Sequence, residues 1–155
     1  MPFQTETSAG GIVYKILPTT DNRQPTTLWL ITQHSQNKGW GFPKGLVGDK
    51  VRNESMDIAA LREVEEEGGV RAKMISKLKE PVSYMYTFQK TLIKKTVHYF
   101  LMEYISGDPK NHDWEMMDAK FVTAEEVEKT LTYKSDKEAF AAALSYKITE
   151  EKKGK

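Results

Sequence analysis

Three glutamates within one five-residue stretch constrain this chain more than any other feature of its sequence. Glu63, Glu66 and Glu67 occupy positions i, i+3 and i+4, so a helix of about 3.6 residues per turn would project all three carboxylates from one side. The like charges of Glu63 and Glu67 would destabilise an isolated helix by roughly 0.2 to 0.5 kcal/mol unless a cation lay between them. The apolar residues that would pack the opposite side on a sheet are Ala60, Leu61 and Val64.

A cluster of carboxylates without thiolate or imidazole neighbours favours a hard divalent ion, which would be Mg²⁺, with Mn²⁺ as a possible substitute. The chain contains no cysteine, which excludes disulfides, thiolate nucleophiles and thiolate zinc sites. Its three histidines, His34, His98 and His112, show no close ligand spacing. Arg62 precedes Glu66 by four residues and is placed to hold that carboxylate.

The glutamates belong to a longer pattern. It reads Gly48, five residues, Glu54, seven residues, and then Arg62-Glu63-Val64-x-Glu66-Glu67-x-Gly69-Val70. This spacing matches the Nudix box, so the chain resembles the Nudix hydrolases, a family that cleaves nucleoside diphosphates linked to another moiety. A solvated acidic helix face is the competing interpretation of the glutamates alone, and the complete box outweighs it.

The resemblance has one departure, in the loop before the helix. Most members place the first glycine of the box in a Pro-Lys-Gly or Pro-Gly-Gly turn, which here is Pro43-Lys44-Gly45. Measured from Gly45, the loop carries three extra residues before Glu54. Either Gly48 takes over the role of this glycine or the loop bulges.

The resemblance implies a fold class and a metal centre. The fold would be α/β, a Nudix-type α/β/α sandwich with a mixed central sheet, and the protein would be an enzyme acting on phosphoric anhydrides. A further glutamate from a later loop commonly serves as metal ligand or base, and Glu115 fits that position. The metal-binding residues that the resemblance carries over are Glu63, Glu66, Glu67 and Glu115, with a backbone contact at Lys44.

Attack of water on phosphorus requires a general base. The candidates are Glu54, Glu66 and Glu115, and the sequence leaves the choice among them open. Arg62 would orient carboxylates rather than react. The side chain of Lys44, in a turn between proline and glycine, is placed to contact a phosphate.

Two stretches after the box, residues 82–88 and 92–104, alternate in polarity and are predicted to form a hairpin. Tyr86 and Lys95 in this hairpin resemble residues of the asymmetric diadenosine tetraphosphate hydrolase branch, in which such a tyrosine stacks on adenine and such a lysine contacts the polyphosphate. The alternative is that the tyrosine packs in the core and the lysine protects an exposed strand edge. His98 shares a predicted face with Lys94 and is a third candidate substrate contact.

The resemblance therefore implies a metal-dependent pyrophosphohydrolase whose partner is a nucleoside polyphosphate, with diadenosine tetraphosphate cleaved to ATP and AMP. A second interpretation keeps the chemistry and changes the substrate to RNA 5′ ends or diphosphoinositol polyphosphates. A third belongs to another class, a Nudix sensor that binds a nucleotide without turnover. The intact glutamate set argues against the sensor, because a pure binder does not need an electrostatically costly metal cluster.

The rest of the chain predicts one Nudix domain over residues 1–149 and a frayed charged tail over 150–155. Asn53 or Ser55 is the predicted N-cap of the acidic helix, and Gly68-Gly69 its left-handed stop. The other predicted strands are residues 4–15, with a kink at 9–11, and residues 27–33, 72–81 and 118–122, and the other predicted helices are residues 123–131 and 135–147.

The charges nearly balance, with 23 Lys and Arg against 22 Asp and Glu. No global field would hold the protein on nucleic acid or on an anionic membrane, so no stable nucleic acid complex and no membrane association are expected. The sequence shows no basic N-terminal region followed by an apolar core, and no apolar run long enough to cross a bilayer. These features predict a cytoplasmic protein and do not specify an oligomeric state.

Overall fold

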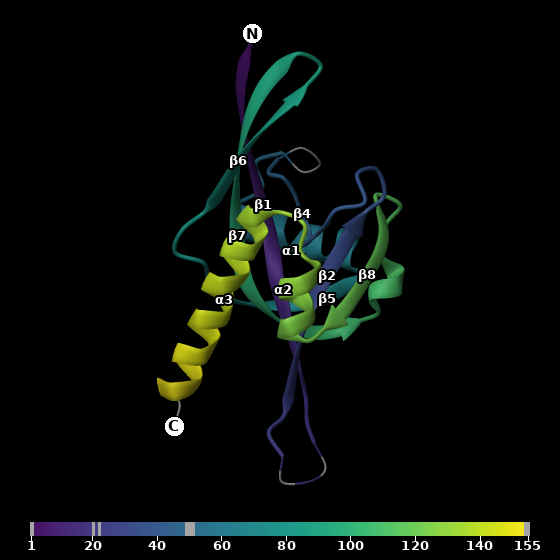
Figure 1. Ribbon diagram of the computed structural model, residues 1–155, viewed down its shortest axis with the longest axis vertical. Helices are drawn as coiled ribbons and strands as arrows, with labels where there is room; N and C mark the ends of the chain where they lie inside the picture. Colours follow the sequence, from purple (N-terminus) through teal and green to yellow (C-terminus); the bar gives the residue numbers. More distant parts are fainter. Residues whose placement is uncertain (1, 20, 22, 49–51, 154–155) are drawn as a thin grey trace.

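The computed structural model describes residues 2–19, 21, 23–48 and 52–153 (Figure 1). A mixed sheet with helices on both faces forms the body of this described part. In chain order the elements are β1 (Phe3–Leu17), β2 (Thr26–His34), β3 (Trp40–Gly41), β4 (Lys44–Leu46), α1 (Met56–Gly68), β5 (Val70–Lys77), β6 (Val82–Phe88), β7 (Thr91–Gly107), the short 3-10 helix η1 (Pro109–Asn111), β8 (Met116–Val122), α2 (Ala124–Thr130) and α3 (Lys134–Lys153).

The long strands β1 and β7 run through the middle of the sheet. They pair in parallel, from Phe3 opposite Leu92 to Tyr14 opposite Glu103. The strand order is β3-β2-β1-β7-β5, with β4 on β1, β6 on β7 and β8 on β2, and each of these other pairings is antiparallel. The sheet is therefore mixed, as predicted.

The structure contains two antiparallel hairpins, β1–β2 and the predicted β6–β7 hairpin. β1 pairs with β2 from Tyr14 opposite Trp29 outward. β6 and β7 are joined at Gln89 and Lys90, whose φ angles are 47° and 65°. Two successive positive φ angles are those of a type I′ turn, which suits the right-handed twist of paired strands.

The small residues of β1 allow close packing rather than a kink. The pairing of β1 with β7 continues without a register shift through Ala9, Gly10 and Gly11. A Cβ on Gly10 would lie 2.3 Å from the carbonyl oxygen of Pro43, and one on Gly11 would lie 2.4 Å from Cγ2 of Val64. The kink expected at residues 9–11 was therefore wrong, because these glycines admit β4 and α1 to the strand.

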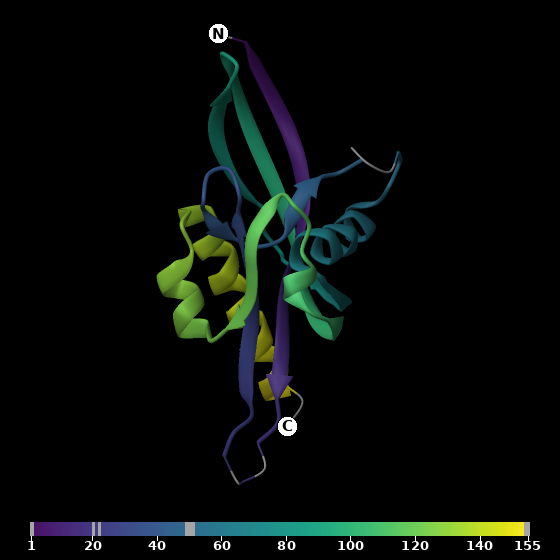
Figure 2. The ribbon, with the colours of Figure 1, turned by 90° about the vertical axis from the view of Figure 1, so that its right-hand side faces the viewer.

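The sheet separates two apolar cores. On one face α1 contributes Ala59, Ala60 and Val64 to a core with Val13 and Met102. On the other face α2 and α3 cover the strands, and the core residues there include Ile12, Trp29, Val97, Tyr99, Val127, Phe140 and Ala143. Figure 2 shows α1 on one side of the sheet and α2 and α3 on the other, which confirms the predicted α/β/α sandwich.

The final helix is longer than the sequence suggested. Phe140 and Ala143 are buried as predicted, but α3 continues past Lys147 to Lys153. Pairs between Lys147 and Glu151 and between Lys153 and Glu150 lie on the added turns, at the i,i+4 and i,i+3 spacings that support a helix. Residues 154–155 of the expected tail lie outside the described residues. Among the described helices, none has the length and apolar character needed to cross a membrane.

Candidate active site

The acidic helix α1 has clear local signals at both ends. Ser55, one of the two predicted N-caps, precedes it in an extended conformation, with φ −75° and ψ 162°. Gly69 follows it with φ 72°, and its N–H donates to the carbonyl oxygen of Glu65 at 3.1 Å. Only a residue that tolerates the left-handed region ends a helix this way at low cost, so the predicted stop is confirmed.

Strand β4 packs directly on the carboxylates of α1. Glu63 and Glu67 are only 3 % and 7 % exposed. The backbone N–H of Lys44 donates to Oε1 of Glu67 at 3.2 Å. A Cβ on Gly45 would lie only 2.2 Å from Oε1 of Glu63, so only glycine lets β4 approach this closely.

Arg62 joins the carboxylates into one network. Its Nε and Nη2 donate to the two oxygens of Glu54 at 3.1 and 2.6 Å, and its Nη1 donates to Glu63 at 2.8 Å and to Glu66 at 3.2 Å. These bonds raise the pKa of Arg62, chiefly through Glu54, and the same pair lowers the pKa of Glu54. The predicted i,i+4 contact with Glu66 is present, and Arg62 is placed to orient carboxylates.

The sequence left open whether Gly45 or Gly48 serves as the first glycine of the box, and in the structure each of them contacts a different glutamate. Gly45 makes the close contact with Glu63. Gly48, with φ 81°, donates its N–H to Oε1 of Glu54 at 3.3 Å, and the Glu54 side chain is only 1 % exposed. Both ends of the loop are therefore fixed to the carboxylate network, although residues 49–51 lie outside the described residues.

Glu115 reaches the site on a turn that is anchored to α1. The N–H of Asp113 donates to the carbonyl oxygen of Glu66 at 2.7 Å, and the N–H and hydroxyl of Ser35 donate to the carbonyl oxygen of Glu115 at 2.9 and 2.8 Å. The pKa of Glu67 is raised to about 8 by burial, with further contributions from the charges of Glu63 and Glu115, and the N–H of Lys44 opposes the rise. The turn that carries Glu115 is therefore bound to the end of α1 through Asp113 and Glu66.

This donor set suits a hard divalent ion. Within the residues that the structure describes, no three acidic or histidine side chains are already grouped as ligands of a metal ion. Oxygens of Glu63 and Glu66 instead accept hydrogen bonds from Arg62. Burial is the main cause of the raised pKa of Glu67, and the charges of Glu63 and Glu115 add to it; a bound cation would stabilise the charged form of Glu67 against both. Oxygen donors of Glu63, Glu66, Glu67 and Glu115 would hold Mg²⁺ or Mn²⁺ there.

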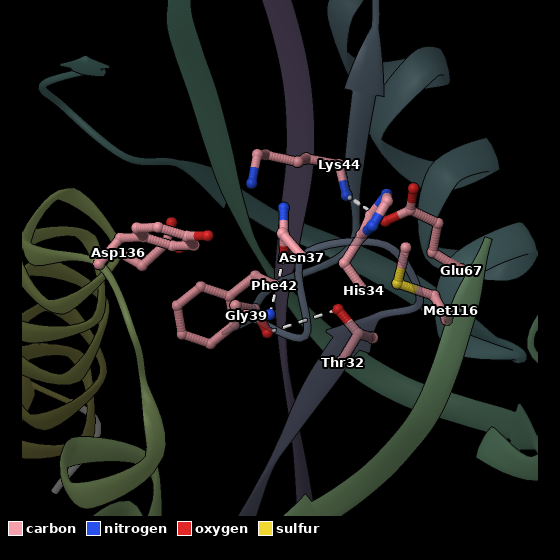
Figure 3. A pocket seen from close by; sticks show the side chains of 11 residues that line it. Thr32, His34, Asn37, Gly39, Phe42, Lys44, Glu67, Met116 and Asp136 are labelled. Carbon is pink, nitrogen blue, oxygen red and sulfur yellow. Dashed lines mark hydrogen bonds between the residues drawn. The ribbon is translucent and has the colours of Figure 1, made fainter. Parts of the chain in front are cut away.

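Lys44 and Glu67 are among the residues that line a small cavity of about 70 Å³ (Figure 3). In Figure 3 the side chain of Lys44 extends from the Glu67 side of the cavity toward Asp136. Burial alone would lower the pKa of Lys44, but Asp136, Tyr84 and Glu67 raise it overall, so the ammonium stays charged. The cavity lining is Thr32, His34, Asn37, Gly39, Gly41, Phe42, Lys44, Glu67, Met116, Tyr133 and Asp136.

Asp136 is a site residue that the sequence did not reveal. It is 3 % exposed and accepts a hydrogen bond from the hydroxyl of Tyr99 at 2.8 Å. In the sequence it is one acid in the first turn of a helix, where exposed acids are common. Nothing local marks it as buried.

Tyr86 and Lys95 lie together on one face of the β6–β7 hairpin. The Tyr86 hydroxyl donates to Oε1 of Glu6 at 2.5 Å, Nζ of Lys95 lies 3.7 Å from the same oxygen, and Nζ is 5.7 Å from the centre of the Tyr86 ring. Burial lowers the pKa of Lys95, and the charge of Lys44 adds to this while Glu6 opposes it. Glu6, a second residue missed from sequence, thus connects both predicted substrate contacts.

His98 lies on the opposite face of β7 from Lys95. Residue 95 and residue 98 differ by an odd number of positions in a continuous strand, so their side chains point to opposite faces. The pKa of His98 is lowered by burial and by Lys77, and its Nδ1 has no hydrogen-bond partner among the described residues. The structure brings Tyr86 and Lys95 together and places His98 apart from them.

A comparison of the sequence with models of protein families identifies the family of this chain. The NUDIX domain model matches residues 13–144. The chain belongs to the Nudix hydrolase family, whose members act on phosphoanhydrides and typically use divalent metal ions.

One curated protein is similar to most of this chain. MutT4 of Mycobacterium tuberculosis, whose name describes it as a mutator protein, is 28% identical over 132 residues, which are 85% of this chain and 52% of that protein. The chain therefore spans about half the length of the curated relative it matches.

Among solved structures, the Nudix domain of Shewanella oneidensis NrtR in complex with ADP ribose superposes with a TM-score of 0.68 at 16% identity, covering 92% of this chain and 88% of that one. A binary complex of the Caenorhabditis elegans Ap4A hydrolase gives a TM-score of 0.61 at 20% identity, covering 93% and 96%. At these identities the likeness shows the shared fold.

Proposed function

We propose that this chain is a metal-dependent pyrophosphohydrolase that cleaves a nucleoside polyphosphate, with diadenosine tetraphosphate converted to ATP and AMP. The observation that carries the proposal is the Tyr86–Lys95 pair, on a hairpin whose lysine interacts electrostatically with Lys44 and Glu67. An aromatic ring together with ammonium groups and carboxylates suits a base joined to a chain of phosphates.

The chemistry divides among the carboxylates, the lysines and a bound metal ion. The metal would polarise phosphate oxygens and lower the pKa of a water molecule. Lys44 and Lys95 hold the negative charge of the phosphates, and the charge on Lys44 is maintained by Asp136. The bond from the water oxygen to phosphorus forms, the bridging P–O bond breaks toward the leaving phosphate, and a carboxylate accepts the proton from the water.

Hydrogen bonding favours two of the three candidate carboxylates as the base. Both oxygens of Glu54 accept hydrogen bonds from Arg62, and one also accepts from Gly48, which lowers the pKa of Glu54 and makes it a weak base. Glu54 is therefore a positioning residue for Arg62. Glu66 and Glu115 remain as the candidate bases, and both lie where the Asp113–Met116 turn meets the end of α1.

Turnover of diadenosine tetraphosphate with Mg²⁺, with the nucleotide products separated by chromatography, tests this proposal. Equal amounts of ATP and AMP, lost in Glu67→Gln, support it. Turnover only of triphosphorylated RNA or of diphosphoinositol polyphosphates would replace the dinucleotide while keeping the reaction. Nucleotide binding without metal-dependent turnover of any of these substrates would contradict the enzyme and favour a sensor.

A further inference from the structure

Trp114 is the most exposed of the large apolar side chains in the described residues, with 81 % of its surface accessible. The other two tryptophans of the chain are packed, since Trp29 is 1 % exposed and Trp40 is half-buried. An indole offers a large flat apolar surface, which is well suited to contact with another ring. Trp114 presents this surface to solvent beside the candidate active site.

The backbone beneath Trp114 is fixed, so its exposure is not that of a loose loop. The N–H of Met116 donates to the carbonyl oxygen of Asp113 at 3.3 Å and closes a turn with Trp114 and Glu115 at its corners. One end of this turn is bound to Glu66 at 2.7 Å, and the carbonyl of Glu115 accepts two bonds from Ser35. The turn therefore holds the indole at a defined place.

That place is next to the reacting groups. Trp114 directly precedes Glu115, a candidate base and metal ligand, so their Cα atoms are about 3.8 Å apart. On the same turn, Asp113 binds the backbone of α1 at Glu66. The indole is thus attached at the edge of the carboxylate cluster.

Trp114 and Tyr86 lie toward opposite edges of the sheet. Tyr86 is on β6 and Trp114 precedes β8, and the strands in between follow the order β6-β7-β1-β2-β8. β6 and β8 are therefore not neighbours in the sheet. Gly45, which packs on Glu63, belongs to β4 on the central strand β1. The carboxylate cluster therefore lies between two aromatic side chains.

We infer that Trp114 is a specificity-determining residue that stacks on a nucleobase of the substrate, at the end of the site opposite Tyr86. The inference rests on the proposed function and deepens it, since it assigns the site a substrate with a base at each end of its phosphate chain. Stacking on an aromatic ring is tolerant of base identity. Loss of the indole weakens binding of the base by roughly 5- to 150-fold.

Tryptophan fluorescence tests the contact without turnover. AMP has no anhydride bond to hydrolyse, and ribose 5-phosphate is its matched control without a base. We expect AMP to quench the wild-type emission and ribose 5-phosphate to leave it unchanged. Trp114→Phe should abolish the quenching, and Trp40→Phe should retain it. Quenching that survives in Trp114→Phe, or that ribose 5-phosphate also produces, would overturn the inference.

Steady-state kinetics tests the consequence for the substrate. With diadenosine tetraphosphate and Mg²⁺, Trp114→Ala should raise KM by roughly 5- to 150-fold and leave kcat within about threefold of the wild type. Trp114→Phe should recover part of the loss, because phenylalanine retains a ring. Met117→Ala removes another exposed apolar side chain from the same region, 48 % exposed, and should change neither parameter. An unchanged KM in Trp114→Ala overturns the inference.

The two experiments separate this inference from the proposed function. Quenching by AMP through Trp114 without turnover of diadenosine tetraphosphate supports the base contact and contradicts the proposed reaction. Turnover that does not depend on Trp114, with no quenching, supports the reaction and overturns the contact. Inorganic tripolyphosphate, which carries no base, should inhibit wild type and Trp114→Ala equally, and a weaker inhibition of the variant would overturn base stacking as the role.

Discussion

Replacing Gly45 with alanine should disable the carboxylate cluster through a single methyl group. The added Cβ would lie 2.2 Å from Oε1 and 2.3 Å from Cδ of Glu63. Glu63 would have to retreat by about 0.8 Å to restore even a 3.0 Å approach. It is 3 % exposed and held by Arg62 at 2.8 Å, so it has little room to move. A displacement of this size at a reacting centre costs on the order of 100-fold in rate.

The assay is kcat/KM for diadenosine tetraphosphate as a function of Mg²⁺ concentration, together with urea unfolding. We expect Gly45→Ala to lower kcat/KM by about 100-fold, to require more Mg²⁺, and to lose about 1 to 3 kcal/mol of stability through overpacking.

Gly48→Ala is the matched control. A Cβ at Gly48 meets no atom within 4 Å, although its φ of 81° adds backbone strain of about 1 to 2 kcal/mol. It should therefore lose stability while keeping kcat/KM within a few-fold of the wild type. Wild-type kcat/KM and Mg²⁺ dependence in Gly45→Ala would refute the reasoning that this glycine sets the position of Glu63.

Three further predictions concern charge and hydrogen bonding. In metal-free protein, the free energy of unfolding should fall as pH rises from about 5 to 8. The reason is that the pKa of Glu67 is raised from 4.5 to about 8, so over this range the folded state retains a proton that the unfolded state has lost. Glu67→Gln should reduce this pH dependence, measured by urea unfolding. Tyr99→Phe removes the donor to the buried carboxylate of Asp136 and should lower the free energy of unfolding by about 1 to 3 kcal/mol. Lys95→Ala should raise KM for diadenosine tetraphosphate by about 10-fold or more. Lys94 lies on the other face of β7, so Lys94→Ala should leave this KM unchanged.

Each of these has an outcome that contradicts it. A urea midpoint of the metal-free wild type that does not change with pH would show that Glu67 takes up no proton on folding. Tyr104→Phe, which removes an exposed hydroxyl bonded to the carbonyl oxygen of Gly107, should cost less than Tyr99→Phe, and equal losses would contradict the role of burial. Equal effects of the two lysine substitutions would show that the face of β7 does not matter.

The acidic helix could be predicted from sequence because its signals are local. The carboxylate spacing, the apolar stripe and the glycine stop all lie within one segment and agree with one another, which is why α1 ends where predicted, before Gly69. The alternation of β6 and β7 was equally local. It correctly separated Lys95 from His98, because a strand sends successive side chains to opposite faces.

Glu6 and Asp136 could not be predicted because their partners are distant in sequence. Glu6 meets Tyr86 and Lys95 only because β1 pairs in parallel with β7. Asp136 meets Tyr99 only because α3 packs back on the sheet. An acid in a strand or in a first helical turn has the same local pattern whether it faces water or a buried hydroxyl. The short strands β3 and β4 lacked the length that makes a strand recognisable.

The parallel pairing of β1 with β7 also has a consequence for how the chain folds. Each residue of β1 finds its β7 partner roughly 90 residues later, so at synthesis rates of about 5 to 20 residues per second the first strand waits on the order of 5 to 20 seconds for it. During that time β1 can pair only with β2 and β4, which precede β7 in the sequence. Contacts of such long range slow folding. Completion of β7 is therefore the step that commits the chain to its final sheet, and until then one side of β1 is an open edge available to other chains.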